Sequence, residues 1–115
     1  MKILVVGPGA MGCLFAAGLK RAGNDVTLLD YIAERAAQIS KQGFIVEEST
    51  GEYRINVPTL TGGISTPPDL VVICVKAYKT REASQTIRPW LDPETAVVTL
   101  QNGIGNVEML EEILL

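Results

Sequence analysis

The chain has 115 residues, enough for one domain of ordinary size and too few for two. Its hydrophobic fraction of 47% can fill a core, while a net charge of −3 without a basic stripe argues against a nucleic-acid surface. No apolar run reaches the length of a membrane span and no signal peptide precedes the first predicted strand, so we expect a cytoplasmic domain with no membrane partner.

The cysteine and histidine content limits the chemistry further. There are two cysteines and no histidine. This argues against a metal site and against catalysis by a histidine acid or base. Cys13 and Cys74 lie in apolar stretches, and we expect both to be reduced core residues.

The first forty residues alternate between strand-like and helix-like segments. Apolar runs predict strands over residues 2–6 and 25–29, and helical spacing predicts helices over 10–22 and 32–41. The larger apolar residues of the first helix would share one face: Met11, Leu14, Phe15, Gly18 and Leu19. Such alternation predicts a parallel sheet with right-handed crossovers.

The middle of the chain has a different pattern. Two short strands over 44–47 and 53–57, with a turn at Ser49-Thr50-Gly51, predict an antiparallel pair. Glycines and paired prolines predict an irregular stretch over 61–68.

The alternation then resumes to the end of the chain. The predicted elements are an inner strand over 70–75, a helix over 79–91, a buried strand over 96–100, a loop over 101–105 and a helix over 106–115. The predicted fold is therefore α/β. It is a Rossmann-type three-layer fold with a mostly parallel sheet and a small antiparallel excursion near residues 44–57.

A glycine-rich turn joins the first predicted strand to the first predicted helix. Gly7 would permit the turn, Gly9 would leave room for a pyrophosphate, and Gly12 would let helix and strand pack closely. Free N–H groups at the helix start would face the phosphates. The expected cradle is Gly7, Pro8, Gly9, Ala10, Met11 and Gly12. A turn that serves packing alone is the alternative.

Asp30 stands 18 residues after Gly12, at the end of the second predicted strand. A carboxylate there accepts hydrogen bonds from the adenosine ribose of NAD, whereas the 2′-phosphate of NADP would meet like charge. We therefore expect NADH to be mildly favoured over NADPH. Arg35 lies one helical turn further on and could still reach a phosphate. FAD would fit the same turn, but its domains usually occur in much longer chains.

Two polar residues follow later strands of the predicted sheet. Lys76 comes after the strand over 70–75, and Asn102 comes after the strand over 96–100. Ligands bind at the carboxyl ends of the strands in open α/β sheets. Alone, Lys76 is equally consistent with a solvated lysine, and Asn102 with a turn former before glycine. Together with the glycine turn, they indicate a site along one edge.

Three motifs in this order resemble the N-terminal domain of the ketopantoate reductase (2-dehydropantoate 2-reductase) family. They are Gly7-x-Gly9-Ala10-Met11-Gly12, Val75-Lys76-Ala77-Tyr78 and Gln101-Asn102-Gly103-x-Gly105. The resemblance covers nearly the whole chain. It implies NAD(P)H-dependent reduction of 2-dehydropantoate to pantoate, on the route to pantothenate and coenzyme A. It also implies that Lys76 contacts the cofactor and that Asn102 lies between the nicotinamide and the substrate.

The chain departs from this family in two respects. Asp30-Tyr31 stands where most members have an arginine suited to NADPH. We expect residues 1–115 to form one dinucleotide-binding domain without the helical C-terminal domain, which, as the resemblance implies, carries a general-acid lysine and a substrate-site glutamate. Asn102 could donate a hydrogen bond to the developing alkoxide, but no residue here can be named as the acid. We expect the cofactor-binding half of a 2-oxo acid reductase, inactive alone.

Other interpretations stay open at this point. A stand-alone NAD-sensing module, like the regulatory domains of potassium-transport systems, would explain the short chain but not the Lys76 and Asn102 motifs. A reductase of another 2-oxo acid would share all three motifs. Intact glycines and Asp30 argue against a degenerate domain kept for dimerisation. Because an isolated domain exposes the surface that its partner domain covers, we also expect self-association.

Overall fold

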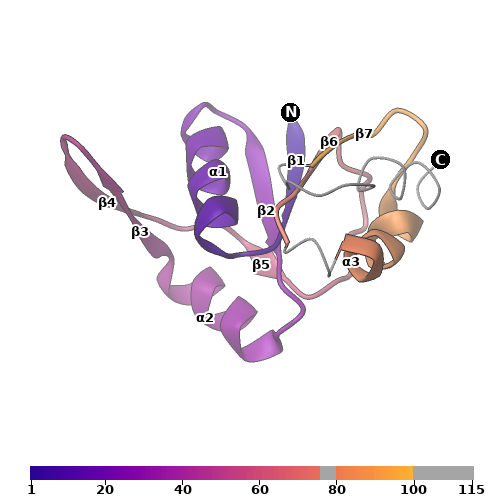
Figure 1. Cartoon of the computed structure of the whole chain (residues 1–115), viewed down its shortest axis with the longest axis horizontal. Coiled ribbons are helices and arrows are strands. Elements are labelled where there is room, and N and C mark those ends of the chain that lie inside the picture. Colours follow the sequence, from indigo (N-terminus) through magenta and orange to yellow (C-terminus); the bar gives the residue numbers. More distant parts are fainter. Residues whose placement is uncertain (76–79, 100–115) are drawn as a thin grey trace.

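A five-stranded parallel sheet forms the centre of the domain (Figure 1). The computed structural model describes residues 1–75 and 80–99 of the chain. Within them the strand order is β5-β2-β1-β6-β7, and every neighbouring pair is parallel. The strands are β1 (Lys2–Val6), β2 (Asp25–Leu29), β5 (Thr59–Leu60), β6 (Leu70–Ile73) and β7 (Ala96–Thr99). This matches the first five strands of the 3-2-1-4-5-6 order of doubly wound sheets, and it confirms the predicted fold class.

In the part of the chain that the structure describes, three α-helices flank the sheet. They are α1 (Ala10–Arg21), α2 (Ala33–Gln42) and α3 (Thr80–Ile87), which continues into the 3₁₀ turn η2 (Arg88–Trp90). The helix predicted over 79–91 is thus shorter, because Pro89 offers no N–H to extend α3. Among the described residues, no helix is long and apolar enough to cross a membrane.

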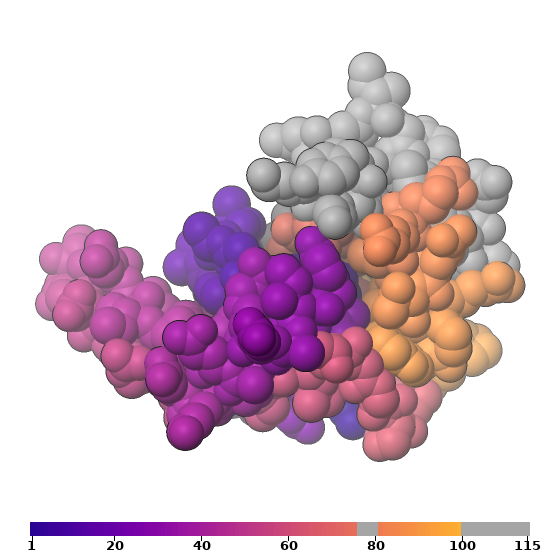
Figure 2. Space-filling view, turned by 90° about the horizontal axis from the view of Figure 1, so that it is seen from below, coloured from indigo at the N-terminus to yellow at the C-terminus, as the bar shows by residue number. Residues whose placement is uncertain are grey.

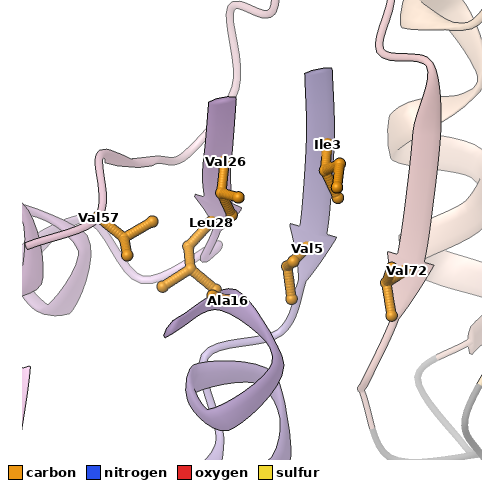
Figure 3. Packing of buried hydrophobic residues seen from close by; sticks show 7 residues of the cluster. All are labelled: Ile3, Val5, Ala16, Val26, Leu28, Val57 and Val72. Atoms are coloured by element: carbon orange, nitrogen blue, oxygen red, sulfur yellow. The ribbon is translucent and has the colours of Figure 1, made fainter. Parts of the chain in front are cut away.

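Two apolar layers hold the sheet, one on each face, because successive strand residues point to opposite sides. On the α1 face, Figure 3 shows seven buried side chains packed together: Ile3, Val5, Ala16, Val26, Leu28, Val57 and Val72. The layer on the α3 face is made by Leu4, Val6, Leu29, Val71, Ile73 and Ile87. The strands β1, β2 and β6 therefore bury side chains on both faces, as their largely apolar sequences predict.

The predicted antiparallel excursion is a separate two-stranded hairpin, β3 (Phe44–Glu48) and β4 (Gly51–Ile55). It projects from one side of the body (Figures 1 and 2). Arg21 at the end of α1 tethers it: the guanidinium lies 3.1 Å from the Glu48 carboxylate and 4.2 Å from the centroid of the Tyr53 ring. These contacts fix the hairpin beside α1.

Most of the predicted apolar face of α1 points away from the core, although Leu19 of that face packs against the α1 layer. The α1 residues Met11, Leu14 and Phe15 are exposed at 53%, 54% and 38%, and the buried residues of α1 are small: Gly12, Ala16 and Ala17. A helix that packs closely against a sheet admits only small side chains at the contact, so the larger ones point outward. Most of the apolar face that the sequence pattern indicates is therefore a surface.

Two strands also differ from their predictions. The strand predicted as buried over 96–100 is β7, whose Val98 is 43% exposed. Of its residues, Val97 packs on the α3 layer. The strand β5 lies in the stretch that precedes the predicted irregular segment and was not predicted. It forms because Thr59 makes two hydrogen bonds with Ser40 of α2, and because N–H groups at the end of β2 donate to the Pro58 and Leu60 carbonyls.

Candidate functional site

The glycine turn joins β1 to α1 at the carboxyl edge of the sheet, and two of its glycines are required by packing. Gly7 has φ +103°, and a Cβ there would lie 3.0 Å from Val75 Cγ1. A Cβ on Gly12 would collide with the carbonyl oxygen of Gly7. The Gly7 N–H donates to the Leu29 carbonyl at 3.0 Å, which ties the turn to the end of β2.

Gly9 differs from both of these residues. A Cβ on Gly9 would meet no atom within 4 Å, so neither packing nor a positive φ requires glycine at this position. Gly9 is the N-cap of α1, and no side chain caps this end. The first turn of α1 contains no acidic residue. The first i to i−4 hydrogen bond of the helix is donated by the Cys13 N–H to the Gly9 carbonyl at 2.9 Å. The start of α1 therefore offers uncompensated N–H groups and a positive dipole end beside open space, which fits a phosphate.

A mostly apolar pocket adjoins the turn at the ends of β1, β2 and β6. It lies beside β1, where the order of the strands reverses and where ligands bind in doubly wound sheets. Its lining includes Val6, Gly7, Leu29, Tyr31, Val75 and Ala83. Such a pocket can hold a flat apolar ring next to the helix start.

Asp30 follows β2 and is paired with Arg35 of α2. Arg35 donates from Nε to Asp30 Oδ2 at 2.6 Å and from Nη2 to Oδ1 at 2.9 Å, and the Ile32 N–H donates to Oδ1 at 3.0 Å. The Asp30 side chain has 0% exposure, whereas that of Arg35 is 47% exposed. The two charges thus form a fork-like ion pair with one buried and one accessible partner.

The Asp30 carboxylate is ionised at neutral pH. Burial by itself would raise its pKa, but the hydrogen bonds from Arg35 and the Ile32 N–H together outweigh burial and hold the pKa below its usual value. Both charges of the pair also act on the Cys13 thiol, so the pair lies near the start of α1. Asp30 is therefore a fixed negative charge beside the glycine turn.

The two cysteines are poor candidates for chemistry. Burial raises the pKa of both the Cys13 and the Cys74 thiols, and Cys13 Sγ donates to the Pro8 carbonyl at 3.3 Å. A raised pKa lowers the thiolate fraction, which is the reactive form. Within residues 1–75 and 80–99, no cluster of three or more histidine, cysteine, aspartate or glutamate side chains could hold a metal ion.

Part of the predicted site lies within the described residues. Gly7 to Gly12 and Asp30 lie at one edge of the sheet, whereas Lys76 and Asn102 lie outside the described residues. Sequence reasoning missed the pocket, because its walls come from segments far apart in the chain, such as Leu29 and Ala83.

The strand order, the glycine turn and the open helix start define a Rossmann-type domain. A family model described as "Ketopantoate reductase PanE/ApbA" matches residues 3–114. The chain belongs to this family. Curated relatives include the 2-dehydropantoate 2-reductases of Halobacterium salinarum, 34% identical over 114 residues, and of Aquifex aeolicus, 38% identical over 115 residues. These alignments cover 97% and 98% of this chain but 37% and 35% of the relatives.

Solved structures agree with this assignment. The ternary structure of D-mandelate dehydrogenase with NADH and anilino(oxo)acetate matches with a TM-score of 0.90 and 31% identity, covering 99% of this chain and 37% of the enzyme. A PanE/ApbA family ketopantoate reductase from Ralstonia eutropha matches with a TM-score of 0.90 and 30% identity, covering 99% of this chain and 38% of that protein. The chain therefore spans somewhat more than a third of these relatives.

Proposed function

We propose that this chain is the dinucleotide-binding domain of an NAD(P)H-dependent 2-dehydropantoate 2-reductase. The observation that carries the proposal is the uncapped start of α1 with open space at Gly9. Packing accounts for glycine at positions 7 and 12 but not at position 9. A phosphate that approaches the backbone does account for it.

The residues present fit a nicotinamide dinucleotide in a simple arrangement. The N–H groups at the start of α1 would hold the pyrophosphate, and the apolar pocket beside Tyr31 would hold the adenosine end. Lys76 would contact the cofactor, and Asn102 would lie between the nicotinamide and the substrate. When bound, the cofactor supplies a hydride to the carbonyl carbon of the substrate.

NADH is the favoured cofactor in this proposal. Asp30 is a fixed negative charge at the end of β2, and the positive charge of Arg35 is already paired with it. A 2′-phosphate would therefore meet a guanidinium whose charge is already compensated by a buried carboxylate. NADH carries no phosphate at this position.

The chain alone would bind the cofactor and catalyse no reduction. The alkoxide that forms from the substrate must be stabilised and protonated, and Asn102 could contribute only a hydrogen bond. A further domain, helical in the family that the sequence resembles, would supply the acid and the substrate pocket. Such a division of roles between two domains is consistent with the chain spanning 37% of the length of these relatives.

Reduction of a different 2-oxo acid is the second candidate function. D-Mandelate dehydrogenase is as similar in structure to this chain as the Ralstonia ketopantoate reductase is. The contacts that select the substrate side chain would lie in the other domain. Substrate tests on a protein that includes both domains discriminate the two candidates.

Calorimetric titration of the 115-residue chain with NADH, and separately with NADPH, tests the proposal. We expect both to bind, NADH more tightly. Gly9→Ala should weaken the binding, and Gly18→Ala is the matched control, because a Cβ on Gly18 also meets no atom within 4 Å. Absence of binding to either cofactor, in a chain shown to be folded, would contradict the proposal.

We also propose that the chain self-associates through the exposed face of α1. Leu14 and Ile45 are 54% and 50% exposed, and they line a hollow between the glycine turn and the hairpin. Contiguous exposed apolar side chains of this kind mark association surfaces. A second copy of the chain would bury them in a symmetric contact.

A further inference from the structure

The Asp30 carboxylate is inaccessible in this structure. Its side chain has 0% exposure, and its two oxygens accept three hydrogen bonds, two from Arg35 and one from the Ile32 N–H. A ribose hydroxyl could reach these oxygens only if Arg35 moved away. Asp30 is therefore placed to act on a bound cofactor through Arg35 rather than by direct contact.

Arg35 is the accessible member of the pair. Its side chain is 47% exposed, and it stands in the first turn of α2, close after Tyr31 at the wall of the apolar pocket. A guanidinium has five N–H groups. The bonds to Asp30 use Nε and Nη2, and Nη1 makes no hydrogen bond to any residue that the structure describes. Arg35 thus keeps donors free while its charge is paired.

We propose that Arg35 is a latent binding residue for the 2′-phosphate of NADPH and that Asp30, a positioning residue, withholds it. This rests on the proposed function of the domain. NADH leaves the ion pair intact. NADPH must share the guanidinium with Asp30 or take it away, and the latter leaves a buried carboxylate without its partner, which is strongly unfavourable.

The first test is a double-mutant cycle measured by calorimetric binding, not by activity. The variants are Asp30→Asn, Arg35→Gln and the double variant, each titrated with NADH and NADPH. Asparagine keeps the size of the side chain and can still accept from the Ile32 N–H, but it releases the charge of Arg35. We expect Asp30→Asn to move the ratio of the two dissociation constants toward NADPH by about tenfold, as one charge-assisted hydrogen bond allows.

The rest of the cycle separates Arg35 from the general loss of a negative charge. In the Arg35→Gln background, Asp30→Asn should shift the ratio less than about threefold, because no guanidinium is left to be released. An equal shift in both backgrounds would overturn the proposal. Glu48→Gln is the matched control: it breaks the exposed Arg21–Glu48 pair with the same change in charge, and it should leave the ratio unchanged.

The second test is a titration of the wild-type chain and does not depend on how the charge-removing variants fold. The Arg35 Nε–H resonance, assigned with Arg35→Lys, is followed by ¹⁵N NMR during titration with 5′-AMP or 2′,5′-ADP. We expect 2′,5′-ADP to move this resonance and 5′-AMP to leave it in place. Binding of 2′,5′-ADP without any change at Arg35 would overturn the inference.

These measurements also separate this inference from the function on which it rests. A folded wild-type chain that binds neither dinucleotide contradicts both proposals. A chain that binds NADH, but whose preference is the same in Asp30→Asn as in Glu48→Gln, contradicts only the role assigned to Arg35.

Discussion

A Cβ on Gly12 would overlap with the carbonyl oxygen of Gly7, so the close contact between these two glycines leaves no room for a side chain at position 12. Gly9, between them, faces open space. One motif therefore contains glycines with two different physical reasons, and substitutions at positions 12 and 9 should have different consequences.

Gly12→Ala should destabilise the fold, and Gly9→Ala should not. The first forces backbone atoms apart and should cost about 3 kcal/mol of unfolding free energy. The second changes a helix N-cap from glycine to alanine and should cost less than about 1 kcal/mol. Urea unfolding measures both values.

Gly9→Ala should nevertheless weaken dinucleotide binding by about tenfold or more, because its methyl group occupies the space left for a phosphate. Gly18→Ala should stabilise α1 by about 0.5–1 kcal/mol without changing affinity. If Gly9→Ala bound the dinucleotides as well as the wild type, the turn would serve packing alone.

The Asp30–Arg35 pair should make stability depend on pH in the acid range. Folding lowers the Asp30 pKa, so the stabilisation is complete above the unfolded-state pKa of about 3.9 and is lost as the pH falls through the lower folded-state value. Asp30→Asn should cost about 1–3 kcal/mol at neutral pH. Urea unfolding of both proteins from pH 6 down to pH 2.5 should show this difference shrinking.

Glu48→Gln gives the contrast for that measurement. It removes an ion pair in which both side chains are about half exposed, and such pairs contribute about 0–1 kcal/mol. Its effect should stay small at every pH. If the difference in unfolding free energy between wild type and Asp30→Asn did not change with pH, the charge of Asp30 would not stabilise the fold.

Lys76→Ala should weaken binding of NADH and NADPH while the fold is retained. In the sequence Lys76 comes three residues after the end of β6, and the family resemblance implies that its charge contacts the cofactor. Calorimetry gives the two affinities and circular dichroism checks the fold. Unchanged affinity for both cofactors would remove Lys76 from the site.

Self-association should depend on the outer face of α1. Leu14→Glu puts a charge into that face and should move the chain toward the monomer, because a buried unpaired carboxylate disfavours the contact. Light scattering over a range of concentrations measures the change. Leu60→Glu alters an apolar residue, 41% exposed, on a different element and should leave the association unchanged. A wild-type chain that stays monomeric at high concentration would contradict the proposal.

The sequence determined the local elements of the fold. The runs at Lys2–Val6 and Asp25–Leu29 form the predicted strands without any change in their bounds, because their consecutive apolar residues suit a strand that is buried on both faces. Gly23 and Gly43 follow the first two helices within two residues and have positive φ, a conformation that glycine adopts without strain. The glycine turn could likewise be predicted, because the glycine motif follows a strand pattern and precedes a helical pattern.

The packing of the elements and the paths of the loops between them decided the rest. The inward face of α1 is set by its closeness to the sheet, which selects Ala16 and Ala17 over the larger residues. The strand β5 exists because Ser40 and β2 bond to it, which no local pattern encodes. The pairing of Asp30 with Arg35 depends on how α2 leaves β2. The periodicity of a sequence indicates which apolar residues share one face of an element. Only packing decides which of these faces are buried and which charged side chains form pairs.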